Sequence, residues 1–292
     1  MKFKNKKTMK NLIFILLFGI TMTACAKDDN EVQNNNDMKT NKDKVVELLK
    51  SIETEATEPI AYINPNKYIQ HNQNVADGLA GFGAVLQQLP EGSARANTIR
   101  VWEDGDYVIA HTEYNFFGPK IGIDIFRFED GLIVEHWDNL QEIATETVSG
   151  RTQIDGPTEI TDVDKTEANK TLVSHLINDI FLGANPDAIT DYISTTQYDQ
   201  HNPGVGDGLV GLGEALAALA EAGMPMVYEQ NHIILGQGNF VLSVSEGIFM
   251  NEKVAFYDIF RIEDGKVVEH WDTIEKIIPE EEAQNTNGKF NF

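Results

Sequence analysis

The sequence predicts an α+β fold that occurs in two tandem copies, and three observations support this prediction. From Asp124 to Ile143, 13 of 20 positions are identical to those from Asp258 to Ile277. The repeat offset is 130 residues in the first two motifs and 134 in the last two, which is the size of a domain and too long for a solenoid unit. In each copy, amphipathic helices precede a run of strands, an order that places helices on one side of an antiparallel sheet.

Four short motifs carry the repeat, and they keep their order in both copies. Because nearly the same spacing separates them, each copy is expected to fold in the same way. The motifs are Tyr68-Ile-Gln-His71-Asn72 with Tyr198-Asp-Gln-His201-Asn202, Asp77-Gly-Leu79 with Asp207-Gly-Leu209, Asp124-Ile-Phe-Arg127 with Asp258-Ile-Phe-Arg261, and Glu135-His-Trp-Asp138 with Glu269-His-Trp-Asp272.

Each copy is expected to open with an amphipathic helix, because apolar residues recur there at helical spacing. Shorter helices are expected at residues 64–68 and 79–89, and at 187–193 and 209–220. Strands are expected at residues 98–103, 107–116, 121–128 and 132–141. Asp-Gly pairs at residues 130–131 and 264–265 indicate tight hairpin turns before the last strand of each copy. The apolar positions of the opening helices are Val45, Leu48, Leu49 and Ile52, and Leu172, Leu176, Ile177 and Ile180.

The N-terminus is typical of an exported protein. A lysine-rich start is followed by a short apolar run at residues 12–20, which is too short for a membrane-spanning helix. Met22-Thr-Ala-Cys25 resembles a bacterial lipobox, in which the cysteine is lipidated and becomes the mature N-terminus. We expect a signal peptide at residues 1–24 and a lipid anchor at Cys25 in the outer membrane of the cell envelope, with Lys27-Asp-Asp29 favouring surface display. An ordinary signal peptide with an incidental cysteine is the alternative.

Polar segments set the expected domain boundaries. A flexible tether is expected at residues 25–40, the first domain at 41–148, a linker at 149–165, the second domain at 166–280 and a polar tail at 281–292. The formal net charge is −23, and it becomes −28 when the five lysines of the signal peptide are removed. This charge repels phosphate groups, so nucleic acid is excluded as a partner and membrane contact is expected through Cys25 only.

The motifs together resemble the SnoaL-like polyketide cyclase family, within the nuclear transport factor 2 (NTF2)-like superfamily. The resemblance lies in Tyr68–Asn72, in Gly105-Asp-Tyr-Val-Ile-Ala-His111, in the block from Ile123 to Asp138 and in Gln141. It spans residues 60–142 and again 190–276. The resemblance implies two cone-shaped α+β barrels, each with a mostly apolar pocket. In the family's cyclases it also implies aldol chemistry without metal or cofactor, whereas other superfamily members are non-catalytic binders.

Asp124 is the candidate catalytic base. The resemblance assigns this role to the aspartate of the Asp-Ile-Phe-Arg segment, and His111 matches the family's pocket histidine, which implies a hydrogen bond to a substrate carbonyl. Alternation along a strand places Asp124 with Phe126 on one face and Ile123 and Ile125 on the other. An aspartate among aromatic rings loses solvation, which raises its pKa toward that of a useful base. A structural or ligand-positioning carboxylate is the alternative.

The second copy departs from this pattern at His111, which is replaced by Val244, and at Gln141, which is replaced by Glu275. Activity is therefore expected in the first copy rather than the second. The two repeated motif histidines are expected either at the pocket rim or in hydrogen bonds to a neighbouring loop. The candidate ligand-binding residues are Tyr68, His71, Phe126, Trp137, Gln141, His201, Asp258 and Trp271.

No metal or other cofactor is expected. A metal site would recruit His136, Asp138 and His71, but no closely spaced pair of histidines or cysteines supports it. The leading hypothesis is a lipoprotein with pockets for a small apolar or carbonyl-containing molecule, in which the first domain catalyses an aldol, isomerase or cyclase-like reaction. The alternative is a non-catalytic small-molecule or surface binding protein built from a pseudo-dimer of the two domains.

Overall fold

The first helix of the fold shows how local sequence signals start and stop an element. The computed structural model describes residues 39–89 and 92–292. Helix α1 (Asn41–Thr54) begins after Thr40, whose hydroxyl accepts a hydrogen bond from the Asp43 backbone N–H, while the Asp43 carboxylate accepts one from the Thr40 N–H. This reciprocal cap satisfies two backbone donors that the helix leaves free. The helix ends at Glu55, which adopts a left-handed conformation.

The first domain consists of helices followed by an antiparallel sheet with one short parallel strand. The sheet order is β1-β5-β4-β3-β2, and β1 pairs with β5 in parallel. After α1 the elements are η1 (Glu58–Tyr62), β1 (Ile69–Gln70), α2 (Gly78–Gln88), β2 (Arg95–Asp104), β3 (Tyr107–Asn115), β4 (Pro119–Glu129) and β5 (Leu132–Glu142).

The second domain repeats this topology, with the sheet order β6-β10-β9-β8-β7 and β6 parallel to β10. The predicted α+β class is therefore confirmed, with helices before strands in both copies. The elements are η2 (Val163–Lys165), α3 (Thr166–Leu176), the π-helix η3 (Ile177–Phe181), η4 (Pro186–Ala188), α4 (Ile189–Tyr192), β6 (Asp199–Gln200), α5 (Gly208–Glu221), β7 (Val227–Gln237), β8 (Phe240–Phe249), β9 (Glu252–Glu263) and β10 (Lys266–Lys276).

One expected helix, at residues 64–68, does not form. The short helix lies earlier, at η1, and the chain then turns at Asn64. The Asn64 side-chain oxygen accepts hydrogen bonds from the backbone N–H groups of Asn66 and Lys67, at 2.9 and 3.2 Å. Such a side-chain turn offers the backbone an alternative to helical hydrogen bonds, which is why the polar sequence here ends the helix.

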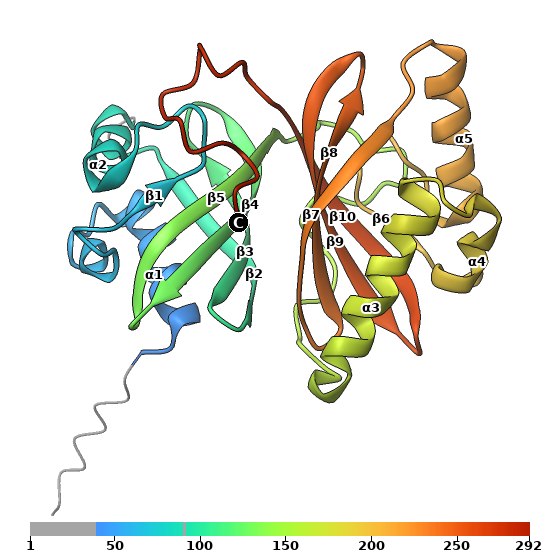
Figure 1. Ribbon diagram of the computed structural model, residues 1–292, viewed down its shortest axis with the longest axis horizontal. Coiled ribbons are helices and arrows are strands. Elements are labelled where there is room, and N and C mark those ends of the chain that lie inside the picture. The colour runs from blue at the N-terminus through green and yellow to red at the C-terminus, as the bar shows by residue number, and fades with distance from the viewer. Residues whose placement is uncertain (1–38, 90–91) are drawn as a thin grey trace, which may run out of the picture. The chain divides into compact units, whose positions relative to one another are not determined.

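The two sheets bury their inner faces against each other. A single cluster of buried residues contains side chains from both sheets, including Trp102, Ile125 and Trp137 of the first domain and Tyr257 and Trp271 of the second. Figure 1 shows the helices on the outer faces, α1 and α2 beside the first sheet and α3 and α5 beside the second. Each sheet therefore has one face for the interface and one for its own helices.

A β-bulge sets the register of the strand pair β4–β5. Next to the hairpin turn, Glu129 pairs with Leu132, but beyond the bulge Asp124 pairs with Asp138. The shift is one residue; without it, Asp124 would lie opposite Trp137. Because successive side chains of a strand point to opposite faces, this single residue decides which side chains share a face with Asp124.

Two segments cross between the domains in equivalent ways: the connector (residues 148–157) packs on the second domain and the C-terminal segment (residues 284–292) packs on the first. The indole N–H of Trp271 donates to the Asp155 carbonyl at 3.0 Å, and that of Trp137 donates to the Asn291 carbonyl at 3.1 Å. The expected polar linker and polar tail thus contribute ordered backbone acceptors to buried indole groups.

The same two segments also hold the repeated motif histidines. His201 Nδ1 lies 2.6 Å from the Thr152 carbonyl oxygen, and His71 Nδ1 lies 2.6 Å from that of Gly288. Each histidine stacks on the tryptophan of its own domain, with ring centroids 4.6 and 4.5 Å apart. Since hydrogen bonds to a neighbouring segment were one of the two expectations for these histidines, the structure supports that alternative.

Residues 39–292 form one compact unit. The expected signal peptide and Cys25 lie outside the described residues, as does nearly all of the expected tether. Within the described ranges, no helix has the length and apolar character that a membrane span requires.

Deletion of residues 284–292 is expected to destabilise the first domain. The deletion removes the carbonyl partners of Trp137 and His71 and the Phe292 ring that stacks on Trp137 at 4.7 Å. Unpaired buried donors and lost ring contacts lower the free energy of unfolding by roughly 3 kcal/mol or more. Urea unfolding followed by tryptophan fluorescence measures this loss; an unchanged midpoint would show that the segment contributes nothing to the folded state.

Candidate active-site cavity of the first domain

A cavity of about 410 Å³ lies between the helices and the outer face of the first sheet. Its walls are largely apolar, since α1 and α2 turn aliphatic and aromatic side chains toward it. Its sheet side is polar and carries several ionisable groups. An apolar enclosure with a few convergent polar groups is typical of small-molecule sites. The helical wall includes Leu48, Leu49, Ile52, Phe82, Val85 and Leu86.

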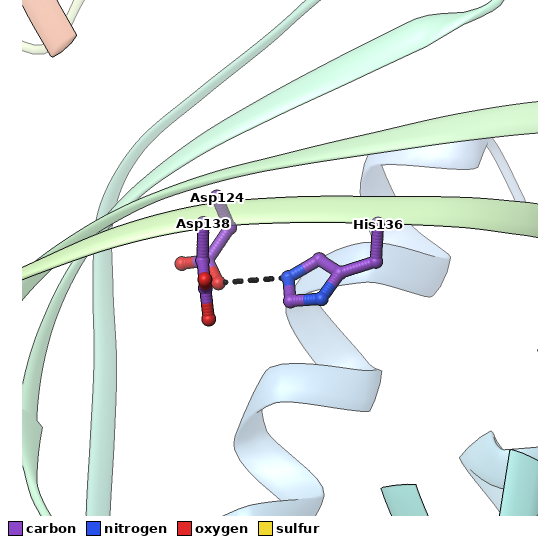
Figure 2. Close-up of side chains that lie close together, drawn as sticks. All are labelled: Asp124, His136 and Asp138. Carbon is purple, nitrogen blue, oxygen red and sulfur yellow. Dashed lines mark hydrogen bonds and ion pairs between the residues drawn. The ribbon is translucent and has the colours of Figure 1, made fainter. Parts of the chain in front are cut away.

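Asp124, His136 and Asp138 form the polar floor of this cavity. They come from the adjacent strands β4 and β5, and all three are buried. Figure 2 shows the two carboxylates side by side, with the His136 ring reaching Asp124; the distance from His136 Nε2 to Asp124 Oδ1 is 3.2 Å. The β-bulge is what places them together, because it brings Asp124 and the even-numbered residues of β5 to one face.

Hydrogen-bond partners restrict where the protons of this cluster lie. Gln70 Oε1 accepts a hydrogen bond from the Asn72 backbone N–H at 2.8 Å, so it is an acceptor. His136 Nδ1 lies 3.1 Å from the same oxygen and therefore carries a proton that it donates. The contact between His136 Nε2 and Asp124 then needs one more proton, either on the imidazole or on the carboxyl group. Asp124 and His136 thus share one mobile proton.

Asp124 has the character of a proton-transfer group. Burial raises the pKa of the Asp124 carboxyl above its ordinary value, while the hydrogen bond from His136 opposes the shift. Tyr114 donates its hydroxyl proton to Asp124 Oδ2 at 2.8 Å, and burial keeps that phenol protonated by raising its pKa well above 10. A carboxylate held by two donors and lining an apolar cavity is oriented for reaction with a ligand.

Two further groups on the cavity wall have spare hydrogen-bonding capacity. Asp138 Oδ2 accepts a hydrogen bond from Asn72 Nδ2 at 2.8 Å, but Asp138 Oδ1 has no partner among the described residues although it is buried. The Tyr68 hydroxyl accepts from Gln70 Nε2 at 3.4 Å, and no described residue accepts its proton. Burial raises the pKa of Tyr68, so its hydroxyl stays a donor.

The ligand atoms of Asp124, His136 and Asp138 lie within 4.8 Å of one another, a spacing from which they can hold a cation. His71, which the sequence-based metal set included, is not part of this group. It lies on the inner side of the sheet, where its Nε2 is 2.8 Å from Glu135 Oε1. The cluster does not require a metal ion, because the proton between Asp124 and His136 already makes their contact a hydrogen bond.

His111 is not among the residues that line the cavity with Asp124, which corrects the expectation that it is a pocket histidine. In the β3–β4 pair, Asp124 is opposite Ala110 while His111 is opposite Ile123, so the His111 ring lies on the inner face of the sheet. There His111 Nδ1 is 3.4 Å from Arg100 Nη1. Burial, with the nearby Arg100 charge, lowers the pKa of His111 well below 6.5 and leaves the ring neutral.

The structure divides the remaining candidates between the two faces. Tyr68 and Phe126 line the cavity. Trp137 and Trp271 lie in the core between the sheets, and the structure does not place them on the cavity wall. Gln141 accepts a hydrogen bond from the Ile274 N–H at 2.8 Å across the domain interface. His71 and His201, held by the crossing segments, likewise lie away from the cavity.

The second domain has the same polar network around Asp258. His270 Nε2 lies 3.1 Å from Asp258 Oδ1, His270 Nδ1 lies 3.1 Å from Gln200 Oε1, and Asn202 donates to Asp272 at 2.6 Å. The Asp258 side chain is completely buried. The same hydrogen-bond arrangement is therefore common to both domains, and the exposure of the aspartate differs, since the Asp124 side chain is 5% exposed.

The aromatic residues around the two aspartates also differ. In the second domain, Tyr228 from β7 donates to Asp258 at 3.0 Å and stacks on Phe256, with ring centroids 4.1 Å apart. The position of Phe256 is Gly122 in the first domain, where the ring of Tyr114 covers the glycine: a Cβ there would lie 2.6 Å from that ring. The second domain thus has two stacked rings where the first has one.

Sequence reasoning missed His136 as the partner of Asp124 and missed Tyr114 as its hydroxyl donor. The shared face of His136 and Asp138 follows from strand alternation, which the sequence does indicate. The link to Asp124 depends on the bulge, and a hairpin register drawn from the Asp130-Gly131 turn alone would put Asp124 on the other face.

The chain matches no protein-family model and no curated protein sequence. Solved structures similar to it include an NTF2-like protein of unknown function from Cytophaga hutchinsonii, with 15% identity, TM-score 0.31 and coverage of 35% of this chain and 90% of that one. TsrD from Streptomyces laurentii has 21% identity, TM-score 0.30 and coverage of 35% and 92%. A SnoaL-like polyketide cyclase from Agrobacterium tumefaciens has 16% identity, TM-score 0.30 and coverage of 36% and 93%. The predicted α+β fold in two tandem copies agrees with the sheet topology, in which the two sheets have the same strand order.

We expect Asp272→Asn to stabilise the protein at neutral pH. Burial raises the pKa of Asp272 from 3.8 to about 6, an effect that the His270 charge opposes. A carboxyl group with a raised pKa binds its proton more tightly in the folded state, so stability falls as the pH rises from about 4 to about 6. The substitution removes this penalty, which is up to about 3 kcal/mol. Urea unfolding at pH 4 and pH 7 measures it, and an equal effect at both values would contradict the explanation.

Proposed function

We propose that the first domain binds a small, mostly apolar carbonyl compound and that Asp124 removes a proton from the carbon next to the carbonyl group. The observation that carries the proposal is a buried carboxylate that lines an apolar-walled cavity and shares a proton with His136. This is the acid–base chemistry of isomerisation, aldol condensation and ring closure. The proposed reaction needs no cofactor, because side chains of the cavity can accept and donate each proton.

In the proposed step, the Asp124 carboxylate takes the proton and the C–H electron pair moves into the carbonyl system, which gives an enolate. Negative charge develops on the carbonyl oxygen, and the Tyr68 hydroxyl is a cavity group that has a proton to donate to it. Tyr114 and His136 hold the carboxylate in place. Return of the proton to another atom of the ligand completes an isomerisation.

We propose that the second domain acts as the non-catalytic half of a pseudo-dimer. Its polar network is retained, but Tyr228 and Phe256 occupy the space over Asp258. Its sheet covers the inner face of the first sheet, which supports the cavity from behind. A protein that binds the ligand without turnover is the second candidate, and it is favoured by the complete burial of Asp258 in one of the two copies.

Asp124→Asn is expected to abolish proton abstraction while the fold is kept. The amide has the same shape but cannot take a proton, and loss of a general base lowers rates by about 100-fold or more. The assay is deuterium exchange at the α-carbon of 1-tetralone in D2O, followed by proton NMR. Since the pKa of Asp124 is raised, the wild-type rate should fall as the pH is lowered through that pKa.

Asp258→Asn is the matched control, because Asp258 has the same partners in the second domain but is completely buried. It should leave the exchange rate within two-fold of wild type. Loss of exchange in this variant but not in Asp124→Asn would reverse the assignment of the active domain. Binding of the ketone by all variants without any exchange would identify a binding protein.

Treatment with EDTA is expected to leave the exchange rate unchanged, because the proposed step uses side chains only. Metal analysis of the purified protein accompanies the assay. If the chelator removes a bound metal and abolishes exchange together, and the added metal restores it, Asp124, His136 and Asp138 act as metal ligands instead.

We further propose that the protein is exported and anchored to the membrane through a lipid on Cys25, as the N-terminal sequence predicts. Cys25→Ala should yield a chain that incorporates no labelled palmitate and stays in the aqueous phase of a detergent partition. Cys25→Ser is the conservative variant and should behave identically. Retention of either variant in the detergent phase would contradict lipidation at this residue.

A further inference from the structure

The cavity of the first domain contains one residue from the second domain. Glu275, near the end of β10, lines the cavity together with residues that all lie between positions 48 and 140. The first domain therefore does not build its site alone. Strands β5 and β10 are in contact at the interface, which brings this carboxylate to the edge of the polar floor.

The C-terminal segment holds Glu275 in place. Lys289 forms an ion pair with the Glu275 carboxylate, and the same ammonium group donates to the Asp138 backbone carbonyl at 2.9 Å. The Lys289 side chain is 5% exposed, so the ion pair is shielded from water and strongly oriented. Burial raises the pKa of Glu275, and the Lys289 charge opposes that shift.

The equivalent positions on the other side of the interface carry no charge. Glu275 corresponds to Gln141, and Lys289 corresponds to Gln153 when the two crossing segments are aligned through their equivalent carbonyl contacts. Gln141 accepts from the Ile274 N–H and Gln153 accepts from the Ala144 N–H, each at 2.8 Å. The charged pair thus occurs on the side of the open cavity, and neutral amides occur on the side filled by aromatic rings.

Glu275 and Asp138 together make one end of the cavity rich in acceptors. Asp138 Oδ1 has no partner among the described residues, and the negative charge of Asp138 is close enough to raise the pKa of Glu275. A buried acceptor without a partner is costly, and a donor from a ligand would satisfy it. The opposite end of the cavity is the apolar wall of α1 and α2.

We propose that Glu275 is a ligand-binding residue of the first domain, and that with Asp138 it receives a hydroxyl or ammonium group at the polar end of an amphiphilic ligand. The inference rests on the proposed binding of a small molecule in this cavity and is independent of proton transfer at Asp124. It gives the second domain a direct part in the site: its β10 carboxylate selects ligands that have a hydrogen-bond donor.

The test compares ligands that share one apolar body. Isothermal titration calorimetry measures the binding of 1-aminotetralin, 1-tetralol, 1-tetralone and tetralin-1-carboxylate to the full soluble chain. Wild type should bind the amine or the alcohol more tightly than the carboxylate. Glu275→Gln should lower the affinity for the preferred donor ligand about ten-fold, as expected for loss of a charge-assisted hydrogen bond. It should change the affinity for 1-tetralone less than two-fold.

Glu252→Gln is the control for the change in net charge. Glu252 lies on β9 and pairs with Lys276 at 3.0 Å, with both side chains more than half exposed. This variant should leave all four affinities unchanged. Circular dichroism and the urea midpoint check that Glu275→Gln remains folded. If Glu275→Gln loses affinity for the amine alone, the site binds an ammonium group. If it loses affinity for the alcohol alone, the site binds a hydroxyl group.

The inference would be overturned if Glu275→Gln bound the amine with the same affinity as wild type and also bound the alcohol with the same affinity as wild type. If 1-tetralone still binds and exchanges in that case, the proposed function stands and only the role of Glu275 falls. If none of the four probes binds to wild type, both the inference and the proposed function are overturned.

Discussion

The burial of two sheets against each other is the interaction on which the rest of this structure depends. Each sheet uses its inner face for the shared core, where Trp137 and Trp271 are completely buried. The outer face is left to the helices, and the cavity of the first domain lies there beneath α1 and α2. The indole N–H groups at the margin of that core need acceptors, and the connector and the C-terminal segment provide them.

The two domains keep the same polar network in different aromatic surroundings. Asp258 and His270 repeat the contact of Asp124 with His136 almost to the tenth of an ångström. The tyrosine that donates to the aspartate comes from β3 in the first domain and from β7 in the second. The hydrogen bond is thus preserved although the tyrosine comes from a different strand.

A buried network of this kind costs stability, because carboxylates without full solvation favour their protonated forms. The raised pKa values of Asp124 and Asp272 express that cost in the two domains. In the first domain the carboxyl group with the raised pKa lines a cavity. In the second domain the Asp258 side chain of the same network is completely buried.

The sequence by itself determined the duplication, the helix-then-strand order and the strand alternation that separates Asp124 from Ile123, since these follow from local patterns and period-two geometry. It did not determine the partner of Asp124. The one-residue bulge between β4 and β5 shifts the register, and this shift places His136 on the same face as Asp124. It also could not show that Lys289 reaches Glu275 at the cavity edge, because contacts between distant segments depend on how the two sheets pack and not on any local pattern.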